Sequence, residues 1–174
     1  MRYLCGVGSN IRPEDNIPAA FGAMADRFGT LHVSCVIRTR PDGIATPRHF
    51  LNALVTFESD ESPQALKEWL NSLEESLGRD RSDPLSSVKD RPLDVDILEH
   101  RQSGRFTGNG IDEPYFQPLL SDSPVGATPL HLDRQVLGEA PATIHRDQGA
   151  GHEVVIHHRQ KLGDYGFKAA FPGQ

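Results

Sequence analysis

The chain has 174 residues, with 18 Lys and Arg against 24 Asp and Glu and a formal net charge of −6. This length suits one domain with a substantial hydrophobic core, and the acidic balance argues against broad nucleic-acid binding, which needs a basic surface. No apolar run approaches the roughly 20 residues that cross a bilayer, so we expect no membrane partner. The two cysteines, Cys5 and Cys35, are too few for a disulfide scaffold or zinc cage and favour buried thiols in a reducing cytoplasm.

The first part of the chain alternates strand and helix patterns. An apolar run at 3–7 predicts a strand. Apolar residues then recur at helical spacing over 17–28, where Asn16 is the expected N-cap and Gly29 the expected end. The β-branched run 31–37 predicts the next strand.

A third strand, a second helix and a fourth strand follow. The run 50–57 alternates, so that one face of the strand carries four apolar side chains, Leu51, Ala53, Val55 and Phe57. Ser62 as N-cap and Pro63 at the first helical position predict a helix that ends at Gly78. A charged loop then leads to a short strand over 93–98.

The order strand, helix, strand, strand, helix, strand predicts an α+β fold. We expect a ferredoxin-like βαββαβ sandwich, with both helices packed on one face of a mainly antiparallel sheet. Residues 1–120 are assigned to this domain, and 121–174 to a loop-rich C-terminal cap or tail of the same domain. Within that extension the patterns favour a short helix over 132–137 and a short strand over 154–156.

The strongest chemical signal is the pair Asp94 and Asp96. Residues two apart on a strand share a face and lie about 6.6 Å apart, so both carboxylates point away from the apolar side formed by Leu93, Val95 and Ile97. Such a pair attracts a hard cation such as Mg²⁺, which also bridges to substrate phosphates. The competing interpretation is an exposed strand edge, and the motif alone does not decide between the two.

Four cationic residues precede this pair in the sequence: Arg79, Arg81, Lys89 and Arg91. Guanidinium groups beside two carboxylates are typical of a polyphosphate site, because a metal ion and arginines neutralise the phosphates together. Any single arginine here also fits a solvated loop with surface ion pairs. The group as a whole favours phosphate binding.

Asn52 interrupts an apolar strand. Without partners its amide would cost about 1–3 kcal/mol there, so either the neighbouring backbone satisfies it or it binds a polar ligand with a donor and an acceptor edge. Phe50 shares its face and belongs to the core or stacks on a flat heterocycle.

Two further motifs carry less information. The segment 6–10 lacks the third glycine of a dinucleotide-binding loop and is interpreted as a strand-end turn. The adjacent His157 and His158 would point to opposite faces of a strand, which argues against a joint metal site.

Taken together, these pieces resemble the 6-hydroxymethyl-7,8-dihydropterin pyrophosphokinase (HPPK) family. The resemblance covers roughly residues 1–100 and rests on five segments in the family's order, 6–10, 38–39, 50–53, 74–81 and 90–97. The last of these, Asp-Arg-Pro-Leu-Asp-Val-Asp-Ile, is the most specific. Members of this family transfer the terminal diphosphate of ATP to the hydroxymethyl group of a reduced pterin and release AMP, in folate biosynthesis.

The resemblance implies a role for each matching residue. Two Mg²⁺ ions would be held by Asp94 and Asp96. Phosphate binding and catalysis would fall to Arg79, Arg81, Arg91, Asp94 and Asp96. The nucleotide side would comprise Glu74, Lys89, Arg91, Ile97 and Tyr115, and the pterin side Thr39, Asp42, Phe50, Asn52 and Phe116. ATP and a reduced pterin are the expected partners; the oligomeric state stays open, with a monomer favoured.

Three departures from the family pattern bear on activity. The segment 112–119 lacks the family's His and Arg, although Tyr115 and Phe116 match a nucleotide-side tyrosine and a second stacking ring. Arg40 and Asp42 stand where the family has small or apolar residues, and the charged loop is slightly longer and lacks an aromatic residue. Two alternatives follow: a degenerate paralogue that binds without turnover, and a diphosphokinase with an altered pterin substrate.

Overall fold

The computed structural model describes residues 1–121, 124–146 and 154–158 of the chain. The first five strands and the two α-helices are β1 (Arg2–Ser9), α1 (Pro13–Phe28), β2 (Thr30–Val33), β3 (Ile37–Thr39), β4 (Phe50–Glu58), α2 (Pro63–Ser76) and β5 (Asp94–Arg101). They are followed by the 3₁₀ helix η1 (Gln117–Leu120) and by β6 (Leu130–Leu132), β7 (Gln135–Leu137), β8 (Ala142–Arg146) and β9 (Val154–His158).

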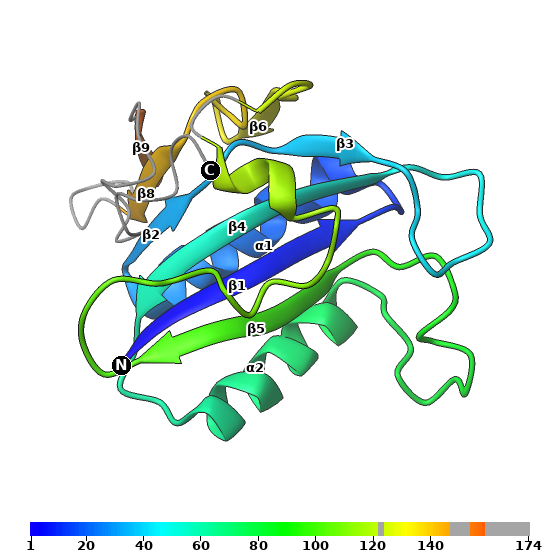
Figure 1. Ribbon diagram of the computed structural model, residues 1–174, viewed down its shortest axis with the longest axis horizontal. Helices are drawn as coiled ribbons and strands as arrows, with labels where there is room; N and C mark the ends of the chain where they lie inside the picture. Colours follow the sequence, from blue (N-terminus) through cyan, green and yellow to red (C-terminus); the bar gives the residue numbers. More distant parts are fainter. Residues whose placement is uncertain (122–123, 147–153, 159–174) are drawn as a thin grey trace.

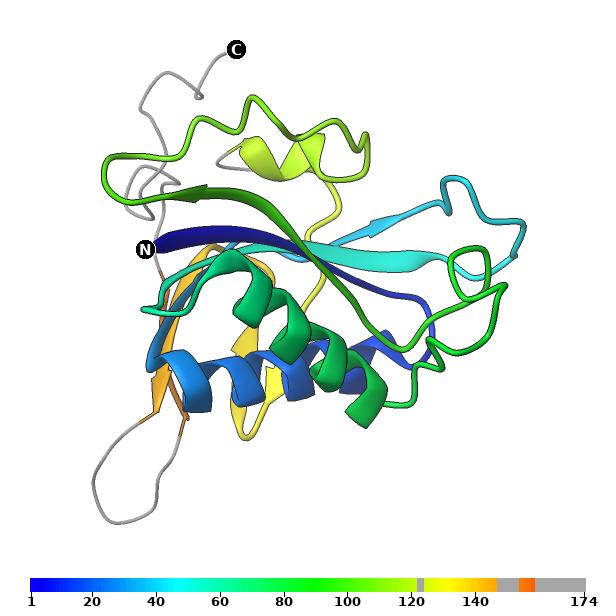
Figure 2. The same cartoon turned by 90° about the horizontal axis from the view of Figure 1, so that it is seen from below.

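In the described part of the chain, a seven-stranded antiparallel sheet has both α-helices on one face, as Figures 1 and 2 show from two directions. Six strands lie in the order β5-β1-β4-β2-β8-β9, and β3 pairs with β4. The predicted α+β class, with its helices on one face of an antiparallel sheet, is confirmed. None of the described helices is long and apolar enough to cross a membrane.

Strand alternation buries one face of the sheet beneath the helices. The four apolar side chains predicted to share a face of β4 all belong to this main core. The rest of the core includes Tyr3, Cys5 and Val7 of β1, Phe21 and Met24 of α1, and Leu66 and Leu70 of α2. Ser62 caps α2 as predicted, because its Oγ accepts a hydrogen bond from the backbone N–H of Ala65 at 3.2 Å. Burial of this apolar area is the main stabilising contribution to the fold.

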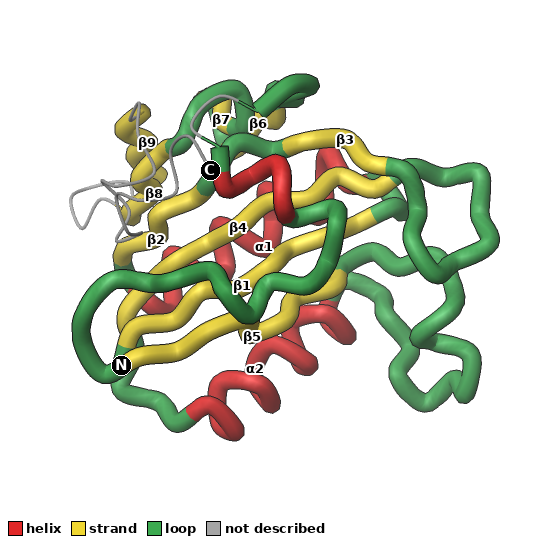
Figure 3. Tube along the Cα trace, viewed as in Figure 1, coloured by secondary structure: helices red, strands yellow, loops and turns green. Residues whose placement is uncertain are grey.

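The opposite face of the sheet is partly covered by the segment 102–121, which is loop except for η1 (Figure 3). A second, smaller core forms beneath it from Leu4, Cys35, Ile37, Leu54, Phe106, Ile111, Phe116 and Leu119. Glu99 of β5 ties the segment down by accepting hydrogen bonds from the backbone N–H groups of Thr107 and Gly108, each at 3.0 Å. The cover leaves open the end of the sheet where β1 finishes and where β4 and β5 begin (Figure 1).

Two predicted boundaries in the first part of the chain are wrong. Helix α1 begins at Pro13 after Arg12, whose φ is 44°, and Asn16 lies inside the helix and donates from Nδ2 to the Ile11 carbonyl at 2.7 Å. The predicted strand 31–37 is broken into β2 and β3. The break occurs because the Ser34 hydroxyl accepts the Leu54 N–H, at 2.8 Å, in place of a backbone carbonyl.

The C-terminal extension contributes to the sheet and is not only a loop-rich cap. The short helix predicted over 132–137 is wrong: β6 and β7 form a hairpin there, with Asp133 at φ 54° in the turn. The strand predicted over 154–156 is confirmed as part of β9. The side chains of His157 and His158 lie outside the described residues.

Strand β8 joins this extension to the rest of the molecule by pairing with β2. Ile144 of β8 is fully buried in the main core, where Leu132 and Leu137 also contribute. Arg146 adds an ion pair from its Nε to Asp26 Oδ1 of α1, at 2.6 Å. We propose on this basis that the described residues after 120 fold as part of the same domain.

We therefore expect Ile144→Ala to lower the free energy of unfolding of the whole domain by about 2–5 kcal/mol, because it leaves a cavity in the main core. Val136→Ala, at a 38% exposed position of the neighbouring hairpin, is the matched control and should cost far less. Urea unfolding followed by the fluorescence of Trp69, the single tryptophan, reports on α2 and not on β8. If Ile144→Ala leaves the urea midpoint of the Trp69 fluorescence change where it is in the unmodified protein, the two parts do not unfold together and the shared domain is contradicted.

Candidate active site

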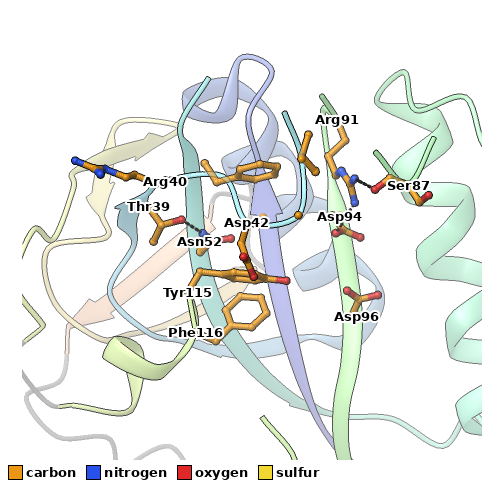
Figure 4. Close-up of a pocket in the computed structure, with 14 residues that line it drawn as sticks. Thr39, Arg40, Asp42, Asn52, Ser87, Arg91, Asp94, Asp96, Tyr115 and Phe116 are labelled. Atoms are coloured by element: carbon orange, nitrogen blue, oxygen red, sulfur yellow. Dashed lines mark hydrogen bonds and ion pairs between the residues drawn. The ribbon is translucent and has the colours of Figure 1, made fainter. Parts of the chain in front are cut away.

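The open end of the sheet holds a cavity of about 260 Å³ on the face away from the helices (Figure 4). Its walls come from β1, β3, β4 and β5, from the β3–β4 loop, and from the segments 77–93 and 102–121. The residues that line it are Gly8, Thr39, Arg40, Asp42, Gly43, Ile44, Phe50, Asn52, Ser87, Arg91, Asp94, Asp96, Tyr115 and Phe116. One cavity thus contains the paired aspartates together with Asn52 and both phenylalanines.

Two glycines of β1 make the floor of this site possible. The antiparallel register places Gly8 between Asn52 and Asp94, and Gly6 opposite Asp96. A Cβ on Gly6 would overlap the Phe116 ring, and one on Gly8 would lie 2.7 Å from Asn52 Oδ1. The interpretation of segment 6–10 as a strand-end turn did not include this role for Gly6 and Gly8. The sequence did contain an indication of it, since a glycine inside a strand often marks a place where another group approaches the backbone closely.

Asp94 and Asp96 lie on one face of β5, as predicted, with Val95 buried on the other face. Asp94 forms ion pairs with Nη1 of Arg79 at 3.1 Å and with Nη1 of Arg91 at 3.0 Å. Burial raises the pKa of Asp96 to about 6, and the negative charges of Asp94, Glu74 and Glu113 act in the same direction, partly opposed by Arg79. Negative charge therefore accumulates around Asp96.

This donor set fits Mg²⁺ held jointly by protein and substrate. Among the described residues, His, Cys, Asp and Glu side chains form no group of three or more that could hold a metal ion. Asp94 and Asp96 thus offer carboxylate oxygens but no complete coordination shell. Mg²⁺ is commonly bound in this way, with one or two carboxylates, several waters and substrate phosphates. A cation would also offset the charge that raises the pKa of Asp96.

Glu74 lies beneath this pair and does not line the cavity. Its side chain is fully buried and accepts hydrogen bonds from the Val95 backbone N–H at 2.8 Å and from Arg81 Nε at 2.9 Å. Arg79 Nη1 contacts the same carboxylate at 3.3 Å and Asp94 at 3.1 Å. The pKa of Glu74 is raised above its ordinary value, because the effect of burial exceeds the opposing effects of the hydrogen bonds and of the two arginine charges. Glu74 thus joins α2 to β5 and orients Arg79.

The four predicted cations occupy different places. Arg91 lines the cavity, contacts Asp94, and donates from Nη2 to the Ser87 carbonyl at 2.7 Å. Arg79 is buried beside Asp94, and its Nε has no hydrogen-bond partner within the described residues. Arg81 is held by Glu74, and Lys89 is paired with Asp83 at the protein surface. The structure therefore brings Arg79 and Arg91 to the aspartates, while Arg81 and Lys89 have partners elsewhere.

The five residues predicted for the pterin side all line the cavity: Thr39, Asp42, Phe50, Asn52 and Phe116. Asn52 is 2% exposed, and its Nδ2 donates to Thr39 Oγ1 at 2.6 Å. A side chain of β3, and not the backbone, therefore satisfies the amide nitrogen. The amide oxygen faces Gly8 at the floor of the cavity.

Of the remaining nucleotide-side predictions, one residue faces the cavity and one faces away. Tyr115 lines the cavity with its ring 4.7 Å from that of Phe116, centroid to centroid. Burial raises the pKa of Tyr115 to about 12, with nearby acidic side chains adding to the effect, so its hydroxyl stays protonated. Ile97 packs its side chain against the main core, on the helix side of the sheet.

Paired aspartates and arginines in one cavity with a buried amide and two phenylalanine rings are the features expected of an enzyme that transfers phosphate groups. The family model described as 7,8-dihydro-6-hydroxymethylpterin-pyrophosphokinase (HPPK) matches residues 4–121, and the chain belongs to this family, as predicted. Relatives named 2-amino-4-hydroxy-6-hydroxymethyldihydropteridine pyrophosphokinase occur in two strains of Porphyromonas gingivalis, ATCC 33277 and W83. Each is 34% identical over 118 residues, which cover 67% of this chain and 80% of the relative.

The raised pKa of Asp96 predicts a pH-dependent gain in stability for Asp96→Asn without metal. The carboxyl group of Asp96 has a pKa of about 6 in the folded protein, against an ordinary value of 3.8. Above pH 6 the folded protein must carry a charge that the unfolded chain carries more easily, so ionisation of Asp96 lowers the stability of the fold. The variant should therefore be more stable than the unmodified protein at pH 8, by less than the full pKa shift would give, because Asp96 is partly exposed and water screens its charge. The gain should vanish near pH 4. Urea titrations in EDTA at both pH values test this, with exposed Asp112→Asn as control; an equal gain at both would contradict it.

Proposed function

We propose that this protein transfers diphosphate from ATP to the hydroxymethyl group of 6-hydroxymethyl-7,8-dihydropterin and releases AMP, in folate biosynthesis. Membership of the HPPK family supports this activity. The observation that carries it is that Asp94, Asp96 and Arg91 line the same cavity as Asn52, Phe50 and Phe116, so a polyphosphate and a flat ring are bound side by side. We place the reaction in the cytoplasm and expect a monomer.

On the nucleotide side, Asp94 and Asp96 would hold the metal, with two Mg²⁺ ions expected. Bound Mg²⁺ supplies charge neutralisation of the phosphate oxygens. Arg91 donates to the triphosphate from within the cavity, and Arg79 keeps Asp94 oriented from below. Arg81, Lys89, Tyr115 and backbone groups near Ile97 complete the nucleotide side, while Glu74 acts through the arginines it binds.

On the pterin side, Asn52 presents an amide edge whose orientation is fixed by Thr39. Phe50 and Phe116 supply ring faces, and Asp42 adds an acceptor at the cavity wall. The pterin hydroxyl then attacks the β-phosphorus in line; an O–P bond forms, the bond to the α-phosphate oxygen breaks, and AMP and a proton are released. The protein needs no nucleophile of its own, because positioning and charge stabilisation suffice.

A second candidate function is binding without turnover. The segment 112–119 has no His or Arg, and Glu113 within it places a carboxylate near Asp96, where it helps to raise the aspartate's pKa. That charge opposes a bound polyphosphate. A diphosphokinase with an altered pterin is the third possibility, because Asp42 lines the cavity.

AMP release separates these functions. We expect steady AMP formation from ATP and Mg²⁺ only when 6-hydroxymethyl-7,8-dihydropterin is present. ATP and pterin binding without AMP would establish the binding protein instead. Reaction only with another reduced pterin in a substrate panel would establish the altered specificity.

Asp96→Ala should abolish the metal-dependent part of ATP binding, because it removes one of the two carboxylates offered to Mg²⁺. Isothermal titration with ATP, in Mg²⁺ and in EDTA, measures this part directly. Asp112→Ala removes the same charge from an exposed site outside the cavity and should bind as the unmodified protein does. Unchanged Mg²⁺-dependent affinity in Asp96→Ala would overturn the metal assignment.

Gly6→Ala should weaken pterin binding about tenfold or more, because the new methyl overlaps the Phe116 ring and small-to-large changes in packed sites cost about 1–3 kcal/mol. Nucleotide affinity should change far less. Gly110→Ala is the matched control, since its Cβ would meet the Leu98 carbonyl at 3.7 Å, an ordinary contact. Fluorescence titration with the pterin gives the affinities; equal values for both variants would remove Phe116 from the pterin site.

A further inference from the structure

Three loops meet at the mouth of the cavity. The first is the turn between β1 and α1, the second is the β3–β4 loop at 40–49, and the third is the segment 77–93 that carries Arg91. Figures 1 and 2 both show the second and third loops side by side at the same end of the sheet. The β3–β4 loop lines the pterin side of the cavity, and the segment 77–93 lines its phosphate side.

Asn10 anchors the phosphate side to the end of β1. Its Oδ1 accepts the Arg91 backbone N–H at 2.7 Å, and its own N–H donates to the Arg91 carbonyl at 3.1 Å. Its Nδ2 donates to Asp90 Oδ1 at 2.8 Å. Asn10 is 3% exposed, so these bonds are shielded from water. These bonds attach the backbone of Asp90 and Arg91 to the end of β1.

Asp90 uses its second oxygen to contact the other loop. Arg48 Nε lies 3.4 Å from Asp90 Oδ2, and the two side chains are 58% and 29% exposed. One carboxylate thus links Asn10 and Arg48, and its chain neighbour is the cavity arginine, Arg91. Arg48 itself does not line the cavity.

We propose that Arg48 is a positioning residue that couples the pterin loop to the phosphate-binding arginine through Asp90. This inference rests on the proposed function, because it assigns the two sides of the cavity to a pterin and a nucleotide. A pterin that orders the loop 40–49 favours the Arg48–Asp90 contact, and that contact holds Arg91 ready for the triphosphate. Coupling of this kind is reciprocal, so the nucleotide must strengthen pterin binding by the same factor.

An exposed ion pair contributes little to stability, so its loss should leave the fold intact. Its effect should appear in the ratio of pterin dissociation constants measured without and with nucleotide. We expect Arg48→Gln to lower this ratio about threefold, in line with the strength of exposed pairs, while pterin affinity without nucleotide changes little.

The test is isothermal titration of 6-hydroxymethyl-7,8-dihydropterin with and without Mg²⁺ and α,β-methylene-ATP, in which the bond that the reaction breaks cannot be cleaved. Arg12→Gln is the matched control, because Arg12 stands beside the same turn but pairs only with Asp15 in the described structure. Arg48→Lys should restore most of the ratio. Asp90→Asn should lower it, and Arg48→Gln should add nothing in that background, as expected for residues that act through one contact.

The outcomes separate this inference from the function on which it rests. If the unmodified protein binds both ligands and Arg48→Gln keeps the full ratio, the positioning role is wrong and the proposed function stands. If Arg12→Gln lowers the ratio as much as Arg48→Gln does, the effect is one of net charge and the specific contact is refuted. If the unmodified protein binds neither ligand, both the function and the inference are overturned.

Discussion

The candidate site depends on one buried carboxylate, that of Glu74. A carboxylate without exposed surface would destabilise the fold strongly if it had no partners. Here it accepts a backbone N–H from Val95 and is paired with Arg79 and Arg81. The same charge therefore positions α2, β5 and the start of the arginine segment relative to one another. Because Arg79 also contacts Asp94, the orientation of the Asp94 side chain follows from Glu74 as well as from its own strand.

A second constraint comes from the absence of side chains at Gly6 and Gly8. Strand β1 lies between β4 and β5, and its apolar side chains on the helix side belong to the main core. On the other side, its two glycines let the Phe116 ring and the Asn52 amide approach the backbone. The sheet thus provides a floor that holds Asp94 and Asn52 in register across β1 and leaves a cavity above it.

Local patterns were sufficient to predict part of this arrangement. The shared face of Asp94 and Asp96 follows from the two-residue period of a strand, and the fold class follows from the order of elements. The partner of Asn52 did not follow, because Thr39 reaches it through the pairing of β3 with β4, which is not local. Glu74 was predicted to contact nucleotide, yet it follows Leu66 and Leu70 at four-residue spacing and so belongs to the buried stripe of α2. The C-terminal hairpins had no clear period, because their strands are short and are defined by pairing with β2 and with one another.

The charges of the cavity favour the entry of a metal ion together with an anionic substrate. Its lining contributes three carboxylates, from Asp42, Asp94 and Asp96, against the guanidinium groups of Arg40 and Arg91. Figure 4 shows Arg40 pointing away from the Asp94 and Asp96 pair, and Arg91 is already bound to Asp94. A polyphosphate entering alone would meet excess negative charge in a partly buried site, where such repulsion is weakly screened. A divalent cation held by Asp94 and Asp96 would offset this negative charge, and Arg91 would then be able to donate to the substrate. The acidic character of the chain is therefore compatible with a highly anionic substrate, provided that the metal enters with it.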